Sequence, residues 1–231
     1  MKRTLTLCAA LTLGLLGCVG DRASIELIGT YAPPYDDECK LEDIKDGAMQ
    51  ILAGSVNLEL RDSYVLVMRL ANRLDASDLE TGSGGNASTI NPASRNDFLF
   101  ERMELTYSCA DTRARCAGFP KIAAQQVALS GVAAVDEHFD LFTDILTADA
   151  VEKFLAFVGP DPIQTAVGIK FVGVLASGGA LETEEYTFPL TIYARERLTE
   201  CERPGDVVNM LTPECTLFFG QDSDYYCGPA L

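Results

Sequence analysis

Apolar and polar residues alternate along much of the middle of the chain, with the two-residue period of a β-strand that buries one face. In the first alternating run, polar residues separate Val56, Leu58 and Leu60. Asp and Ser at 62–63 favour a turn directly after it. Further runs with the same period predict strands over 64–74, 97–108 and, more weakly, 126–135.

A different period marks an amphipathic helix. Thr147 is a favourable N-cap, and Gly159-Pro160 is a helix stop. Between them, apolar residues at i, i+3, i+4 and i+7 predict a stripe that packs against the core; they are Val151, Phe154, Leu155 and Val158.

The region 165–193 predicts a long hairpin. Ser177-Gly178-Gly179-Ala180 forms its turn, because glycine adopts positive φ angles at little cost. Pro189 lacks a backbone N–H and therefore indicates a sheet edge or a bulge. Acidic residues at the start of the second arm disfavour pairing with other chains; they are Glu182, Glu184 and Glu185.

Together these elements predict a mainly β fold: an antiparallel β-sandwich of immunoglobulin-like or related type, with one inserted helix. We place the sandwich at 48–197. Residues 198–231 form a cysteine-containing C-terminal appendage that is too small to fold without disulfides. The polar segment 75–96 is a long loop, and loops of this length are functional or disordered. Its composition favours disorder.

The composition suits a globular protein, with 48% hydrophobic and 23% charged residues in 231 positions. The formal net charge is −16 and the pI is about 4.4. Such a surface repels phosphate backbones, so we expect no nucleic-acid partner. We interpret the excess of carboxylates as a source of solubility rather than as an acidic active site.

The first 17 residues have the layout of a secretory signal peptide. Lys2 and Arg3 precede an uncharged run over 5–16, which is shorter than the roughly 20 residues that a membrane-spanning helix needs. The end of this run, Leu15-Leu16-Gly17-Cys18, resembles the bacterial lipobox. The resemblance implies that residues 1–17 are removed and that Cys18 carries lipid.

A lipid on Cys18 would anchor the chain to a membrane. The lipobox pathway supplies three acyl chains, and stable anchoring needs more than one. Val19, rather than Asp, follows the cysteine. By the same resemblance this implies the outer membrane of a bacterial envelope, on its periplasmic face or its surface. Residues 18–47 would be a tether that leads into the sandwich.

Six cysteines remain once Cys8 leaves with the signal peptide and Cys18 is lipidated. An even number in an exported protein predicts three disulfides. Cys109 and Cys116 bracket a short polar turn, so we predict that they pair with each other. One tail cysteine then pairs with Cys39; the tail cysteines are Cys201, Cys215 and Cys227. A zinc site is disfavoured, because no CxxC motif occurs.

No catalytic constellation is recognisable. The chain lacks G-x-S-x-G and S-x-x-K motifs. His138 stands among acidic residues without ligand partners at helical spacing, so a solvated surface turn is favoured over a metal or acid–base site. Asp222 and Asp224 have the opening spacing of a calcium loop, but its glycine and glutamate are missing. We therefore expect no enzymatic activity, no cofactor and no metal.

The order of several short stretches resembles a group of uncharacterised predicted lipoproteins of myxobacteria. The stretches are SYVLVMRLANRL, RNDFLFERMELTY, the hairpin FVGVLASGGALETEEYTFPLTIY and the terminal GQDSDYYC. The resemblance implies a lipobox signal peptide, an envelope location and a cysteine-bearing tail, but no reaction. Ala194-Arg195 stands where that group often has a cysteine pair, which implies fewer tail disulfides here.

The sequence thus predicts a lipid-anchored bacterial envelope protein that acts as a structural or interaction module. Its partners would be the membrane, through Cys18, and an envelope protein or glycan. The alternative is a binding module for a small ligand, an ion or an envelope polysaccharide through the 75–96 loop.

Overall fold

The structure, a computed structural model, describes residues 25–36, 40–74, 96–159, 161–195, 207–210, 221–222 and 225–228. Within these ranges the protein is mainly β with one helix, which confirms the predicted fold class. The elements are β1 (Ile25–Tyr31), β2 (Gly54–Asn57), β3 (Val65–Asn72), β4 (Phe98–Cys109), β5 (Gln125–Ala133), β6 (His138–Asp144), α1 (Ala148–Phe157), β7 (Ile163–Leu175), β8 (Ala180–Glu182), β9 (Tyr186–Tyr193), β10 (Val207–Met210) and β11 (Tyr225–Gly228).

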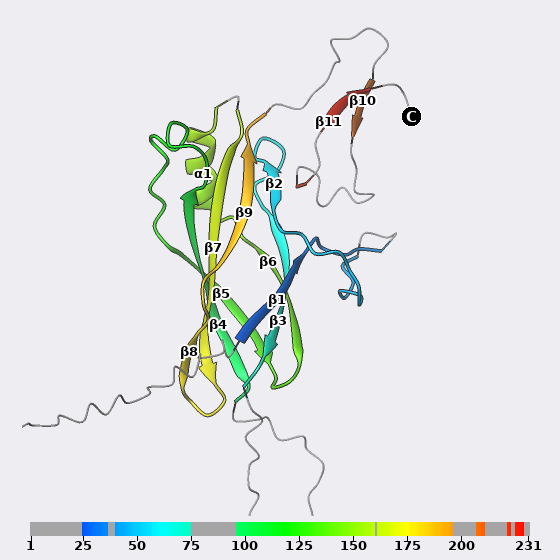
Figure 1. The fold of residues 1–231 in the computed structure, drawn as a ribbon, viewed down its shortest axis with the longest axis vertical. Helices are drawn as coiled ribbons and strands as arrows, with labels where there is room; N and C mark the ends of the chain where they lie inside the picture. Colours follow the sequence, from blue (N-terminus) through cyan, green and yellow to red (C-terminus); the bar gives the residue numbers. More distant parts are fainter. Residues whose placement is uncertain are drawn as a thin grey trace, which may run out of the picture.

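Two sheets pack face to face to form the sandwich (Figure 1). The smaller sheet has the order β1-β3-β6. The larger has the order β2-β9-β7-β4-β5, and β8 pairs with β7 beside this path. The parallel pairing of β2 with β9 departs from the predicted antiparallel pattern, because the chain between them crosses to the smaller sheet and returns. β10 and β11 form a separate two-stranded sheet.

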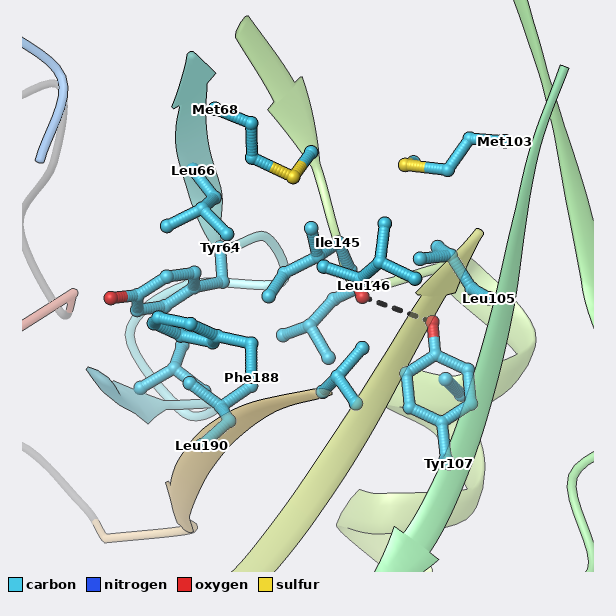
Figure 2. Packing of buried hydrophobic residues seen from close by; sticks show 14 of the residues in the cluster. Tyr64, Leu66, Met68, Met103, Leu105, Tyr107, Ile145, Leu146, Phe188 and Leu190 are labelled. Carbon is cyan, nitrogen blue, oxygen red and sulfur yellow. Dashed lines mark hydrogen bonds between the residues drawn. The ribbon is translucent and has the colours of Figure 1, made fainter. Parts of the chain in front are cut away.

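The inward faces of both sheets supply one apolar core. Leu66 and Met68 on β3 lie opposite Met103 and Leu105 on β4, and all four are fully buried (Figure 2). Tyr107 extends this core toward α1 and donates a hydrogen bond from its hydroxyl to the carbonyl of Ile145 at 3.0 Å. Burying this tyrosine is tolerated because its polar group finds a partner.

Helix α1 begins where the sequence predicts. The Oγ1 of Thr147 accepts a hydrogen bond from the Ala150 N–H at 3.3 Å, as an N-cap does. Val151 and Phe154 are buried, and the Phe154 ring meets that of Tyr107 edge to face at 5.7 Å. The helix therefore closes one end of the sandwich (Figure 1).

β1 and β6 were not predicted, and β1 corrects the expected domain boundary. The sandwich begins at Ile25, inside the range expected to be tether. Its alternation is hidden because a bulge between Leu27 and Gly29 shifts the register against β3. β6 begins at His138, where the sequence indicated a surface turn. Both faces of β6 contact protein, so its pattern lacks clear alternation.

The structure shortens one predicted strand and confirms the expected position of Pro189. The strand predicted over 56–60 ends at Asn57, whose carbonyl accepts turn hydrogen bonds from the N–H groups of Leu60 and Arg61. Pro189 lies in β9 just before the part of that strand that pairs with β2. It therefore stands at a sheet edge, as predicted.

The two ends of the sandwich differ in what they carry. Ile25 pairs with Asn72, so β1 starts beside the end of β3. The Asn72 side chain donates hydrogen bonds to the carbonyls of Asn96 and Ala133, at 2.8 and 2.9 Å. The segment 75–96 thus leaves and rejoins the body at the end where β1 begins. The opposite end carries α1 (Figure 1).

A disulfide joins Cys109 and Cys116, the pair predicted from the short turn between them, with their Cα atoms 5.7 Å apart. It lies within the body, beside α1. Cys39, Cys201 and Cys215 lie outside the described residues, so the predicted link between tail and tether stays a prediction.

Candidate functional site

The described residue pair Gln221–Asp222 of the C-terminal appendage contacts the body at the junction of the two sheets. We call this pair the docked dipeptide. The surface that receives it, the tail-docking site, consists of Gly54, Ser55, Val56, Tyr64 and Val65.

Tyr64 forms the floor of the tail-docking site. It is fully buried, and its ring packs against Phe188 with centroids 5.7 Å apart. Its hydroxyl points away from the apolar cluster (Figure 2). Gly54 lies directly over it, since a Cβ at this position would come within 2.0 Å of the Tyr64 Oη. A glycine is therefore required above the phenol.

Gln221 acts as a short strand segment. Its backbone forms an isolated antiparallel bridge with Val56. Its side-chain Nε2 donates to the Val65 carbonyl at 2.7 Å, and its Oε1 accepts from the Val65 N–H at 2.9 Å. The residue is buried. A primary amide satisfies both backbone groups at once, which neither a carboxylate nor an apolar side chain can do.

Asp222 fixes the other half of the contact. Its Oδ1 accepts from the Ser55 N–H at 2.6 Å, and its Oδ2 accepts from the Tyr64 hydroxyl at 2.7 Å. Its own N–H donates to the Ser55 carbonyl at 2.8 Å. The residue adopts a φ of 52°, in the left-handed region that Asp tolerates better than most residues. The three hydrogen bonds of Asp222, with the two of Gln221, offset this local strain.

The electrostatics of the site follow from partial burial. Desolvation raises the pKa of Asp222 above its usual range, although the hydrogen bonds from Tyr64 and Ser55 oppose that rise. Burial, and then the nearby charge of Asp222, raises the pKa of Tyr64, so its hydroxyl remains a donor at all ordinary pH values. The tyrosine therefore serves as a fixed hydrogen-bond donor and not as an acid.

Asp144 holds the backbone of Tyr64 in place. Its Oδ1 accepts hydrogen bonds from the N–H groups of Tyr64 and Leu146, both at 2.9 Å. Desolvation raises the pKa of Asp144, against the effect of these two bonds. The backbone that presents Tyr64 is thus held by a side chain on a neighbouring strand.

The residues singled out in the sequence are not brought together into one site. Cys18 lies outside the described residues, as do the 75–95 part of the long loop and Asp224. Cys227 is placed on β11, where its backbone pairs with Val208. His138 is exposed at the start of β6. Across the described ranges, no group of three or more His, Cys, Asp or Glu residues could hold a metal ion.

A groove of about 580 Å³ lies beside the smaller sheet. Residues 31–35, 42 and 44–49 line it, among them Tyr31, Pro33, Ile44 and Met49. The Met49 side chain is 86% exposed, which leaves an apolar edge in contact with solvent. Exposed apolar surface of this kind is common where proteins bind partners.

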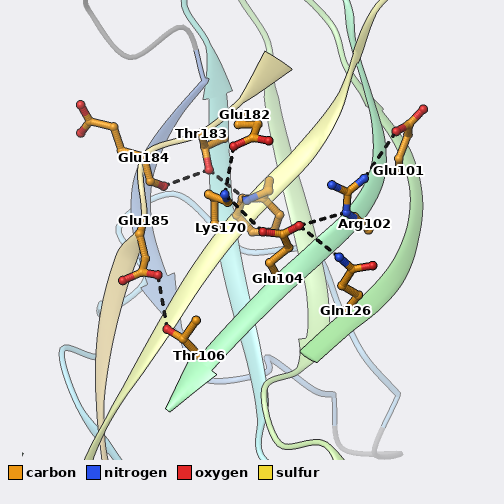
Figure 3. Close-up of polar contacts among 11 residues, drawn as sticks. Glu101, Arg102, Glu104, Thr106, Gln126, Lys170, Glu182, Thr183, Glu184 and Glu185 are labelled. Atoms are coloured by element: carbon orange, nitrogen blue, oxygen red, sulfur yellow. Dashed lines mark hydrogen bonds and ion pairs between the residues drawn. The ribbon is translucent and has the colours of Figure 1, made fainter. Parts of the chain in front are cut away.

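The outer face of the larger sheet is charged instead (Figure 3). Lys170 on β7 lies between two carboxylates, with its Nζ 3.2 Å from Glu104 and 2.9 Å from Glu182. Arg102 contacts the same Glu104 at 3.1 Å. Cations and carboxylates therefore neutralise one another across neighbouring strands and leave a polar, solvated face.

Comparison with models of known protein families, with curated proteins and with solved structures finds no match to this chain. No helix in the described part of the chain is long and apolar enough to cross a bilayer.

The tail-docking site could not be found by sequence reasoning. The sequence identified Asp222 only through its spacing from Asp224, whereas in the structure both of its carboxylate oxygens accept hydrogen bonds from the body. Its partners lie 158 and 167 positions away along the chain. The only signal was the short motif Gly220-Gln221-Asp222, which does not reveal what it contacts.

Proposed function

We propose that this protein is a lipid-anchored bacterial envelope protein that acts as a structural or interaction module, sorted to the outer membrane. The observation that carries the proposal is the stretch Leu15-Leu16-Gly17-Cys18, which stands only seven residues before β1 begins at Ile25. An anchor this close to the folded body suits a module that works at the membrane.

The short spacing limits how the body stands on the membrane. Seven residues span at most about 25 Å when fully extended. The 13 residues of β7 extend about 43 Å along the sandwich. The end with α1 therefore cannot turn down to the bilayer without the body entering it. In this proposal the end that carries Ile25 and Asn72 faces the membrane, and α1 faces away.

Two features of the body support an interaction role. The groove beside Ile44 and Met49, which Glu42, Lys45 and Asp46 also line, offers a surface for a protein partner. The tail-docking site holds a segment of chain through hydrogen bonds, which is a mode of protein recognition rather than of catalysis.

The anchor is tested by metabolic labelling with palmitate. We expect Cys18→Ala to abolish incorporation and to leave the precursor uncleaved. Cys8→Ala is the matched control, because Cys8 lies in the same hydrophobic run but outside the lipobox; it should be labelled like the wild type. Labelled Cys18→Ala protein would reject the anchor.

The interaction role is tested by cross-linking intact envelopes and isolating the tagged protein. We expect the same protein partner in each preparation, and its loss in a Met49→Glu variant that places a charge at the groove. Recovery of glycan or metal alone would favour the alternative, a ligand-binding module that uses the 75–96 loop.

A further inference from the structure

We propose that an opening between the two sheets binds an extended, basic segment of a partner protein, which adds to the sandwich as a strand. We call this opening the seam. It lies between the first residues of β1, Ile25–Leu27, and the residues 183–186 at the start of β9, and it encloses a hollow of about 210 Å³. The seam shares no lining residue with the tail-docking site or with the groove beside Met49, and the inference does not depend on the lipid anchor.

The floor of the hollow is the apolar core of the sandwich. Leu70, Ile169 and Phe171 line it, and all three are at most 3% exposed. Leu27 lines it from the smaller sheet and Tyr186 from the larger sheet, and both are only partly buried. The core is therefore open to an apolar group that enters between the sheets.

The size of the hollow suits one aliphatic side chain. An apolar cavity of about 150 Å³ is large enough to bind a molecule of the size of benzene. Sites for drug-sized ligands usually enclose about 300 Å³ or more. The hollow therefore fits a side chain that anchors a longer segment better than it fits a self-contained small ligand.

Unpaired strand edges border the seam on both sides. β1 is the outer strand of the smaller sheet, and the pairing of β9 with β2 starts only at Leu190. Among the described residues, Ile25–Leu27 pair with β3 alone, and Tyr186–Phe188 pair with β7 alone. The backbone N–H and C=O groups of such edges can pair with an added strand.

The chain itself adds a segment to the same edge of β1 farther along. The Ile51 N–H donates to the Thr30 carbonyl at 2.8 Å, and the Gln50 Nε2 donates to the Ile28 carbonyl at 3.4 Å. Tyr31 and Gln50 also form an antiparallel bridge. The edge of β1 therefore accepts an extended segment, and a partner strand beside the hollow would continue this pairing toward Ile25.

The charge at the seam favours a basic occupant. Glu184 lines the hollow and is exposed, and its side chain points away from Lys170 and the carboxylates around it (Figure 3). Within the described ranges, no basic side chain pairs with Glu184. Glu26, on the other side of the seam, is paired with Arg73 at 3.1 Å. Glu184 is thus the carboxylate that a Lys or Arg of the partner would neutralise.

The same charge disfavours a second copy as the occupant. The chain carries a formal net charge of −16, so two copies repel each other as they approach. A partner segment with basic residues on either side of an apolar one is attracted instead. Its apolar side chain enters the hollow, its backbone pairs with the edge of β1 or β9, and a basic side chain contacts Glu184.

Three synthetic peptides test this recognition in calorimetric titrations of the purified full-length chain. In acetyl-TKTLTKT-amide, the leucine and both lysines lie on one face of an extended strand. Acetyl-TETLTET-amide reverses the charge. Acetyl-TKPLPKT-amide keeps the charge and the leucine but loses two backbone N–H groups. We expect the first peptide to bind at least tenfold more tightly than either of the others.

Two neighbouring glutamates supply the matched variants. Glu184→Gln should weaken binding of the lysine peptide about fivefold at low salt, as expected for a partly exposed ion pair. Glu185→Gln removes the same charge, but the Glu185 carboxylate accepts a hydrogen bond from the Thr106 hydroxyl at 3.3 Å on the outer face of the larger sheet. It should change binding less than twofold. Leu27→Phe fills the hollow and should abolish binding.

Equal binding of the lysine and glutamate peptides, or of the lysine and proline peptides, would overturn the proposal. Unchanged binding to Glu184→Gln or to Leu27→Phe would overturn it as well, provided that near-ultraviolet circular dichroism shows a native fold. A dimer of the free protein that Leu27→Phe dissociates in light scattering would assign the seam to a second copy and reject the basic partner.

Discussion

The outer faces of the two sheets differ in what covers them. On the smaller sheet, Tyr31, Val67 and Phe142 form a row across three strands, and Ile44, from the described segment 40–52, packs on top of it. On the larger sheet the corresponding face is open, and Lys170 and its carboxylate partners contact solvent.

An ion pair therefore contributes differently to stability on each face. On the covered face Arg69 and Asp140 form a bidentate pair at 2.8 Å for both bonds, with side chains only 17% and 19% exposed. Arg69 also donates to the Ile44 carbonyl at 2.8 Å and thereby fastens the covering segment. Partial burial weakens screening by water, so the pair depends strongly on both partners.

The largest expected effect comes from Arg69→Met. It leaves Asp140 partly buried without its partner and should lower the free energy of unfolding by about 2 kcal/mol in urea titrations. Arg73→Met is the matched control, because its partner Glu26 lies at 3.1 Å but both side chains are about half exposed. The control should lose less than about 1 kcal/mol. Equal losses would contradict the difference between covered and open pairs.

A smaller loss should follow Val67→Ala, which empties part of the apolar row. We expect about 1.5–2 kcal/mol, because the side chain is fully buried. The loosened cover should also be cut faster by a protease within 40–52. Thr106→Ala on the open face is the control, with a change within about 0.5 kcal/mol. Unchanged proteolysis of Val67→Ala would mean that the row does not hold the segment.

Lys170→Met should have little effect on the thermal midpoint. Its partner Glu182 is 57% exposed to salt and water. Glu104 is only 20% exposed, but it keeps its ion pair with Arg102 when Lys170 is removed. The wild type and the variant should also converge as salt rises from 0.05 to about 0.5 M. A large loss of thermal stability would show that the charged face is structural after all.

The smallest expected effect is on stability at acidic pH. Hydrogen bonds from Lys170, and then from Arg102, hold the pKa of Glu104 below its usual range. Because the folded pKa is the lower one, ionised Glu104 contributes stability above its unfolded pKa of about 4.3, and this is lost as pH falls through the folded value. Between pH 5 and 3, Glu104→Gln should therefore lose slightly less stability than the wild type. If stability falls with pH in parallel for the wild type and Glu104→Gln, ionised Glu104 makes no such contribution.

Much of the fold could be predicted where one face of an element stays polar. The strand from 97 to 108 keeps its alternation because its outward side chains lie on an open sheet surface. The strand from 64 to 74 could be predicted although its outward face is covered, because the charged Arg69 stands among its outward residues. The turn at Gly178 has the positive φ of 95° that its sequence requires. β1 and β6 escaped prediction because protein covers both of their faces or a bulge interrupts the pattern.

The tail-docking site escaped prediction for a different reason. Neither Gln221 nor Asp222 belongs to a periodic element. Each is held by hydrogen bonds from backbone groups on β2 or β3. Ser55 and Val65 act through their backbone, so their side chains carry no signal at all. Beside the motif Gly220-Gln221-Asp222, Gly54 is tied to the site through the space that Tyr64 needs, but that need is visible only in the structure.

The sequence by itself determined what depends on neighbours along the chain: the strand periods, the cap at Thr147, the hairpin turn and the pairing of Cys109 with Cys116 across seven positions. These are short-range effects of backbone sterics and chain proximity. Only the tertiary structure decided which face of the smaller sheet is covered, that β2 runs parallel to β9, and where Gln221–Asp222 docks. Those outcomes depend on groups up to 167 positions apart, which meet only when the two sheets bury a common core.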